Sequence, residues 1–104
     1  MGSNNHAVRL LSVADRDLQE LISYLAAENP DAAATALDRL ETQLQGLQRH
    51  PFLGRTPNDP KLARLGYRVL AIHNYLALYK VKEKTVLIHR VLHGARDFVR
   101  LLMN

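Results

Sequence analysis

Cysteine is absent from the sequence, and its absence removes several kinds of chemistry at once. Disulfide bonds, thiolate metal sites and cysteine nucleophiles are all excluded. A core without disulfides must be held by packing alone, which suits a reducing compartment, and we expect a cytoplasmic protein. Long apolar runs are absent too, and residues 1–5 do not resemble the start of a signal peptide, so we expect no membrane association.

Acidic residues are scarce in one half of the chain, which makes the charge distribution uneven. Residues 1–48 hold seven acidic and three basic side chains, a net charge of −4. Residues 49–104 hold three acidic and eleven basic side chains, a net charge of +8. A segregated field of this kind favours an anionic partner for the second half, and both nucleic acid and an acidic peptide qualify.

The length of 104 residues and the hydrophobic content of 47% fit a single globular domain. We assign residues 6–104 to this domain and residues 1–5 to a disordered or expression-derived N-terminus. Residues 6–12 predict a short first strand. Ser12 is expected to cap a helix, because Asp15 stands three residues later, as in a capping box.

A pair of helices is predicted between the first strand and a long loop. The first helix should end near Glu28, since Asn29 can cap a second helix and Pro30 fits the first turn of that helix. Apolar residues at helical spacing continue to Leu47, and the helix should stop at Pro51. The short link makes the two helices an antiparallel hairpin.

The second half of the chain predicts a loop followed by three strands. The loop covers residues 51–65, and strands are expected at 67–73, 75–81 and 85–93. Because the connections are short, these strands form an antiparallel meander. Residues 95–102 can form a short C-terminal helix. The predicted fold class is therefore α+β, with a short N-terminal strand and a helical hairpin packed on a small antiparallel sheet.

Several short segments occur in an order that is similar to the RelE/ParE toxin superfamily, in particular its ParE-like, plasmid stabilisation branch. The segments that carry the resemblance are Ala14–Leu18, Asn29-Pro30, Leu47, His50-Pro51 with Gly54-Arg55, Gly66–Arg68, Tyr75–Tyr79 and Arg90–Asp97. The resemblance covers residues 8–102. It implies the toxin of a type II toxin–antitoxin module, without a cofactor and with a cognate antitoxin encoded beside it.

The resemblance leaves the target of the toxin open. ParE-like toxins inhibit DNA gyrase by direct binding without chemistry of their own, and this is the function we expect first. The alternative is a ribosome-dependent endoribonuclease that cleaves messenger RNA, as RelE-like members do. A second alternative is a non-toxic binding domain on the same scaffold. Fold alone does not choose between them, and a homodimer and a heterotetramer with the antitoxin are both compatible with the sequence.

Arg68 and Arg90 are candidate catalytic residues, because each is a charge placed within an apolar strand. Such arginines can lay their stems across hydrophobic neighbours or grip a phosphate or a carboxylate in a fork, and the resemblance favours the second use. His93 ends the last strand, where it could serve as a general acid or as a hydrogen-bonded structural residue, and we favour the structural role. No convincing general base accompanies it, which weakens the nuclease alternative.

The basic half also supplies candidates for contact with the target or the antitoxin. These are Arg55, Lys61, Arg64, Arg68, Tyr79, Lys80, Arg90 and Arg96. A metal site is not expected, since His73, His89 and His93 have no cysteine or carboxylate to complete a ligand set.

Overall fold

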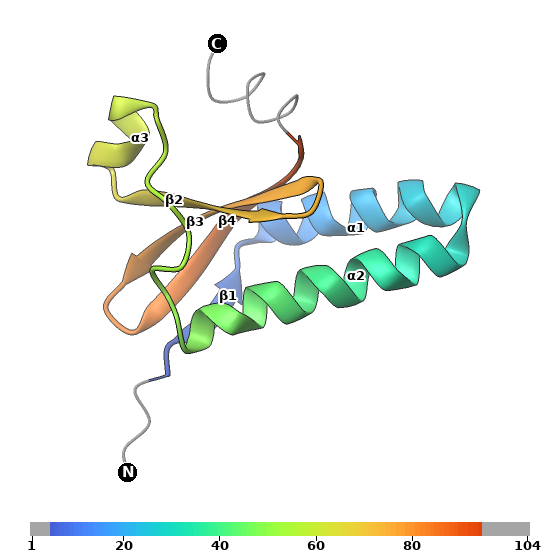
Figure 1. Cartoon of the computed structure of the whole chain (residues 1–104), viewed down its shortest axis with the longest axis horizontal. Coiled ribbons are helices and arrows are strands. Elements are labelled where there is room, and N and C mark those ends of the chain that lie inside the picture. Colours follow the sequence, from blue (N-terminus) through green and yellow to red (C-terminus); the bar gives the residue numbers. More distant parts are fainter. Residues whose placement is uncertain (1–4, 95–104) are drawn as a thin grey trace.

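The computed structural model describes residues 5–94 of the chain, and these residues form four strands and four helical segments (Figure 1). In chain order they are β1 (Ala7–Leu10), α1 (Ser12–Glu28), α2 (Pro30–Gln45), the 3-10 turn η1 (Gly46–Gln48), α3 (Pro60–Arg64), β2 (Tyr67–Ile72), β3 (Tyr75–Lys82) and β4 (Thr85–His93). The predicted α+β fold is confirmed. The C-terminal helix predicted at 95–102 lies outside the described residues.

The first helix begins without the side-chain cap that its sequence predicts. Leu11 is the capping residue, Ser12 is already helical, and no side chain caps the helix. The reason is that Leu11 still belongs to the sheet edge, since its amide donates to the Ile88 carbonyl at 3.0 Å. Asp15, the predicted partner of Ser12, instead accepts a 2.8 Å hydrogen bond from the side chain of Gln19.

The second helix begins as its sequence predicts. The Asn29 side-chain oxygen accepts a hydrogen bond from the Ala32 amide at 3.1 Å, and Pro30 occupies the first turn. The turn between α1 and α2 projects beyond the end of the sheet, and the two helices run back alongside each other (Figure 1). The predicted helical hairpin is therefore confirmed.

The segment predicted as a loop at 51–65 contains the short helix α3. Asp59 caps this helix, with its carboxylate accepting from the Lys61 amide at 2.8 Å, and Pro60 occupies the first turn. This Asp-Pro pair uses the same chemistry as Asn29-Pro30 one helix earlier. The loop assignment was wrong for residues 60–64 because five residues carry too little periodicity to indicate a helix.

The four strands form one sheet in the order β1-β4-β3-β2. The meander of β2, β3 and β4 is antiparallel as predicted, whereas β1 pairs in parallel with β4, with Ala7 beside Thr85. The register between β3 and β4 shifts near Leu78 and Tyr79, so that Leu78 faces Arg90 and Tyr79 faces Ile88. A shift of this kind leaves His89 as an extra residue in β4.

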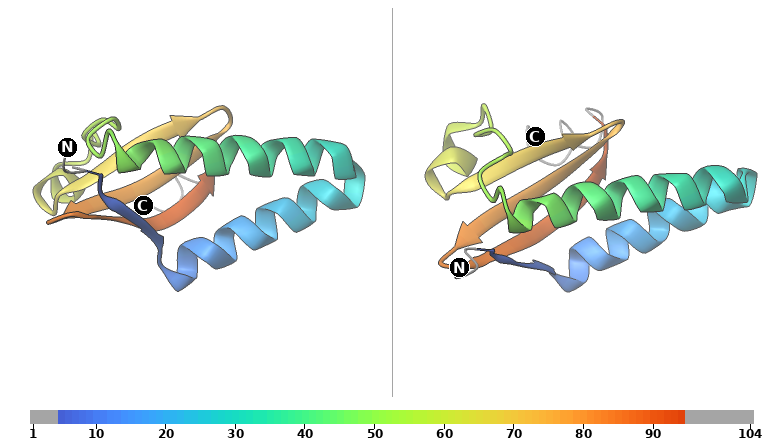
Figure 2. Two further views of the ribbon diagram at one scale, coloured as in Figure 1. Left: turned by 90° about the horizontal axis from the view of Figure 1, so that it is seen from below. Right: turned by 60° about the horizontal axis from the view of Figure 1, so that its bottom comes forward.

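The helical hairpin covers one face of the sheet, with α1 against β4 and α2 against β2 (Figure 2). The buried side chains between these layers form the hydrophobic core: Ala14, Leu40, Leu44, Leu47, Leu70, Ile72, Ala77, Tyr79, Val86, Ile88 and Val91. Leu18 and Leu21 of α1 are half-buried and pack against this core. Within residues 5–94, no helix is long and apolar enough to cross a membrane.

Candidate functional site

Arg90, a candidate phosphate-gripping residue, is bound within the protein to Asp17 of α1. The Arg90 Nε and Nη2 atoms donate to the two carboxylate oxygens at 2.7 and 2.9 Å, a bidentate pair. The same carboxylate accepts the Val91 amide at 3.0 Å. The side chain of Asp17 is only 13% exposed and that of Arg90 is 34% exposed. Asp17 thus joins α1 to the part of β4 that lies beyond the end of β1.

Arg68 is likewise engaged inside the protein, at the opposite edge of the sheet. Its Nε donates to the Gly54 carbonyl at 3.1 Å, and its Nη2 donates to the carbonyls of Gly54 at 2.7 Å and Phe52 at 3.1 Å. Its guanidinium carbon also lies 5.3 Å from the centre of the Phe52 ring. The fork of Arg68 therefore fixes the segment between η1 and α3 to the start of β2.

Tyr79, predicted as a binding residue, is completely buried and does not reach the surface. Its hydroxyl accepts a 2.8 Å hydrogen bond from the Gly54 amide. A Cβ atom at Gly54 would lie 2.7 Å from the Val69 carbonyl oxygen and 2.8 Å from the Tyr79 ring, so only glycine fits there. The apolar neighbours of Tyr79 on β3 gave no indication of which face its side chain takes.

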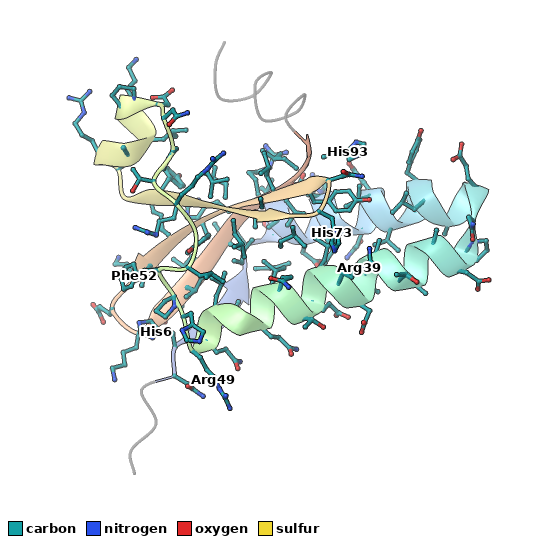
Figure 3. The ribbon with its side chains drawn as sticks, in the orientation of Figure 1. His6, Arg39, Arg49, Phe52, His73 and His93 are labelled. Atoms are coloured by element: carbon teal, nitrogen blue, oxygen red, sulfur yellow. The ribbon has the colours of Figure 1, made fainter. Side chains whose placement is uncertain are left out.

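His93 lies away from the Arg68 fork, toward the other end of the sheet. It lies at the end of β4 opposite Tyr75, whose ring centre is 5.4 Å from the His93 ring, whereas Arg68 lies opposite Tyr79. Figure 3 shows His93 at the end of the sheet that also holds His73, and Phe52 at the other end. The structure therefore does not bring Arg68, Arg90 and His93 together into one site.

A cluster that the sequence analysis did not identify lies where the start of β2 pairs with β3, beside the irregularity in β4. Lys80 places its ammonium 4.5 Å from the centre of the Tyr67 ring, and the His89 ring meets the same tyrosine edge-on at 5.0 Å. The Tyr67 hydroxyl and His89 Nδ1 are 3.3 Å apart. Burial, and secondarily the positive charge of Lys80, lower the pKa of His89 below its ordinary value. We call Tyr67, Lys80 and His89 the outer-face cluster.

The outer-face cluster could have been found only in part from the sequence. A short hairpin between β2 and β3 pairs Tyr67 with Lys80, as the register shows. His89 joins them because of the irregularity in β4, and its position therefore depends on a bulge that no residue in the sequence signals.

The remaining predicted contact residues form a basic surface around α3. The side chains of Arg55, Lys61 and Arg64 are exposed. The backbone of Arg55 is fixed, since its amide and carbonyl both bond to Val69. Lys80 belongs to the outer-face cluster, and Arg96 lies outside the described residues.

One further hollow lies between α2 and the turn that joins β2 to β3. Its volume is about 590 Å³, and its lining includes Thr35, Arg39, His73 and Tyr75. Figure 3 shows Arg39 and His73 together at this end of the molecule. None of the predicted site residues lines it. Across residues 5–94, no three potential metal ligands lie close enough to hold an ion.

Comparisons with known proteins agree with this architecture. Residues 8–98 match the family described as the ParE toxin of the type II toxin–antitoxin system parDE. Among solved structures, the fold is similar to a chain of the chromosomal ParDE system from P. aeruginosa, with a TM-score of 0.73 and 23% identity over 88% of this chain and 99% of that one.

A second solved structure is the toxin–antitoxin complex RelBE2 from Mycobacterium tuberculosis, with a TM-score of 0.61 and 27% identity over 86% of this chain and 98% of that one. No curated protein matches the sequence significantly. Because the family match covers most of the chain and the fold agrees, the chain belongs to the ParE toxin family of type II toxin–antitoxin systems.

Proposed function

We propose that the protein is a toxin that inhibits DNA gyrase by direct binding in the cytoplasm and is neutralised by a cognate antitoxin. The family match supports the toxin assignment, and both similar structures come from toxin–antitoxin complexes. The choice of binding over chemistry rests on one observation. The arginines that a nuclease of this fold would need for the scissile phosphate are both engaged within the protein.

Separating Arg90 from Asp17 has a high free-energy cost. A phosphate that captured the Arg90 fork would leave the largely buried carboxylate of Asp17 without its cation. Removing the partner of a desolvated charge costs about 3–5 kcal/mol, more than the ~1.5–3 kcal/mol that a new charge-assisted hydrogen bond contributes. Release of Arg68 would in turn free the Phe52 and Gly54 carbonyls and loosen the segment that they fix. Both arginines therefore act as structural residues.

The antitoxin is expected to be acidic where it meets the second half of the chain. Among residues 49–94, the only acidic side chains are Asp59, which caps α3, and Glu83, which lies in a turn. An extended segment that folds on contact would bury apolar surface for affinity and use its charges for association rate and register.

The endoribonuclease alternative keeps one specific observation in its favour. His89 in the outer-face cluster has a lowered pKa and is therefore neutral near pH 7, the form that a general base requires. Lys80 and the Tyr67 hydroxyl stand next to it. This group could accept a proton, but its neighbours do not include the arginine fork that would hold a phosphate.

Induced expression with separate readouts of DNA and messenger RNA tests the proposal. Gyrase inhibition predicts loss of plasmid supercoiling and broken DNA, with ribosome-bound transcripts uncut. His89→Gln and His93→Gln should then leave growth arrest intact, whereas a nuclease would lose about 10²–10⁴-fold in rate with its general base or acid. Cleaved transcripts that disappear with His89→Gln would overturn gyrase inhibition in favour of the nuclease. Expression without growth arrest would favour a non-toxic binding domain.

A further inference from the structure

Two large apolar side chains stand side by side on the surface between η1 and α3. Phe52 is 60% exposed and Leu53 is 56% exposed. Single exposed hydrophobic residues are common on protein surfaces and need no explanation. An adjacent pair in a segment without regular secondary structure is less ordinary, because its exposure is not a by-product of a helix or strand pattern. We call this pair the Phe52–Leu53 tip.

The backbone that carries the tip is fixed from both sides. Arg68 holds the Phe52 carbonyl, and the buried Tyr79 hydroxyl holds the Gly54 amide. The Leu53 amide bonds to the His50 carbonyl, and Arg55 continues into paired backbone at β2. Two side-chain anchors, the backbone hydrogen bonds on either side and a position that admits only glycine thus hold two side chains that add little to the core. A rigid, exposed apolar pair loses little entropy on binding, which is the property of an interface anchor.

The surroundings of the tip are cationic. Between residues 49 and 68 the chain holds five basic side chains, Arg49, Arg55, Lys61, Arg64 and Arg68, and a single acidic one, Asp59. Asp59 is turned inward to the amides of α3. Figure 3 places Arg49 at the same end of the molecule as Phe52. The complementary surface is therefore an apolar recess with carboxylates at its rim.

We propose that the Phe52–Leu53 tip is the anchor by which the toxin docks on its target protein, entering an apolar recess with an acidic rim. The inference rests on the proposed function. A folded target suits this anchor better than the antitoxin does, because a preformed knob fits a preformed recess, whereas a segment that folds on contact follows extended surface. A membrane is a poorer partner, because two apolar side chains bury too little surface for stable insertion.

The test replaces both tip residues with serine and compares this double variant with Tyr24→Ser. Tyr24 is the matched control, since it is an aromatic side chain on α1 that is 66% exposed. Each protein is measured for thermal stability, for growth arrest on induction and for inhibition of purified DNA gyrase. The double variant should keep the melting temperature of the unaltered protein and need about 30-fold more protein for half-inhibition, the loss expected at a binding hot spot of about 2 kcal/mol. Tyr24→Ser should behave as the unaltered protein.

The outcomes separate this inference from the proposed function. If the unaltered protein arrests growth without inhibiting gyrase, and Phe52→Ser with Leu53→Ser abolishes the arrest, gyrase is the wrong target and the docking anchor stands. A double variant that folds and remains fully toxic overturns the anchor. Binding of the unaltered protein, but not the double variant, to vesicles of anionic phospholipid would also overturn it and assign the tip to a membrane surface.

Discussion

Asp17 and Arg90 lie 73 residues apart in the sequence and form a bidentate ion pair that closes the sheet against the first helix. β1 is too short to pair with the whole of β4, and Asp17 supplies a hydrogen-bond acceptor beyond the end of β1. Pairing with β1 ends near Ile88, and the Asp17 carboxylate accepts the amide of Val91, three residues further along β4. The Asp17 side chain of α1 therefore continues the hydrogen bonding of the β4 backbone beyond the end of β1.

Asp17→Ala should lower the free energy of unfolding by about 2 kcal/mol, because it removes the carboxylate to which the Val91 amide and the Arg90 guanidinium donate. This loss of stability is at the lower end of the range for a buried ion pair, because Arg90 is partly exposed. Denaturant melts measure it. Asp38→Ala, at an exposed position on α2, should change stability by less than about 0.5 kcal/mol. Equal losses in both variants would contradict a structural role for Asp17.

Gly54→Ala and Gly46→Ala should have opposite effects on stability. At Gly54 the new methyl group would overlap the Val69 carbonyl and the Tyr79 ring, so we expect a loss of about 2 kcal/mol or more. At Gly46 nothing lies within 4 Å of the new methyl group, and the backbone is helical, so alanine should stabilise the fold by about 0.4–1 kcal/mol. Thermal melts of the two variants check the difference, and a neutral Gly54→Ala would show that the segment is loosely held.

His89 should titrate below its ordinary range in the folded protein, because burial and Lys80 both disfavour its charged form. The unfolded chain then binds the proton more readily, so stability is full above about pH 6.5 and declines as the pH falls below it. NMR titration of the His89 ring measures the pKa directly. Lys80→Met should raise this pKa while leaving it below the ordinary value, since burial remains. A pKa that does not respond to Lys80→Met would rule out the charge as a cause.

Leu40→Ala should cost about 2–5 kcal/mol of stability, because Leu40 is completely buried at the contact of α2 with the sheet. Leu65→Ala is the matched control, since Leu65 is exposed and contributes little to the core. Its effect should remain within about 0.5 kcal/mol. Chemical denaturation of the two variants gives both values. A loss below about 1 kcal/mol for Leu40→Ala would mean that this contact does not carry the core.

The elements that the sequence predicted well are those with local signals. The helical hairpin follows from apolar spacing and from Asn29-Pro30, whose capping hydrogen bond spans only residues 29–32. Asp59-Pro60 carries the same start signal for α3, but the five residues of this helix are too few to show the apolar periodicity that would complete the prediction. The position of the start of α1 was predicted, but its side-chain cap was wrong, because the Leu11 amide is bound to the Ile88 carbonyl of a strand far along the chain.

The candidate site was harder to predict, because its residues are defined by partners that no local pattern reveals. Arg68 and Arg90 stand out in the sequence as charges within apolar strands. Their hydrogen-bond partners are the Phe52 and Gly54 carbonyls and Asp17, none of which a strand pattern connects to them. Tyr79 could not be assigned to a face, since both faces of β3 are apolar. The contacts of His89 depend on the irregularity in the pairing of β3 with β4, which the sequence does not indicate.

The parallel pairing of β1 with β4 also determines the order in which the chain can assemble. Translation delivers β1 and the helical hairpin first, but the strand that lies between β1 and β3 is delivered last. Contacts between such distant segments require closure of a long loop before any bond is gained. A chain interrupted before Thr85 would lack the neighbour of β1 and one neighbour of β3, and Asp17 would have no cation to bind. Translation products that end before Thr85 should therefore be unfolded and harmless, and growth arrest should require chains that include β4.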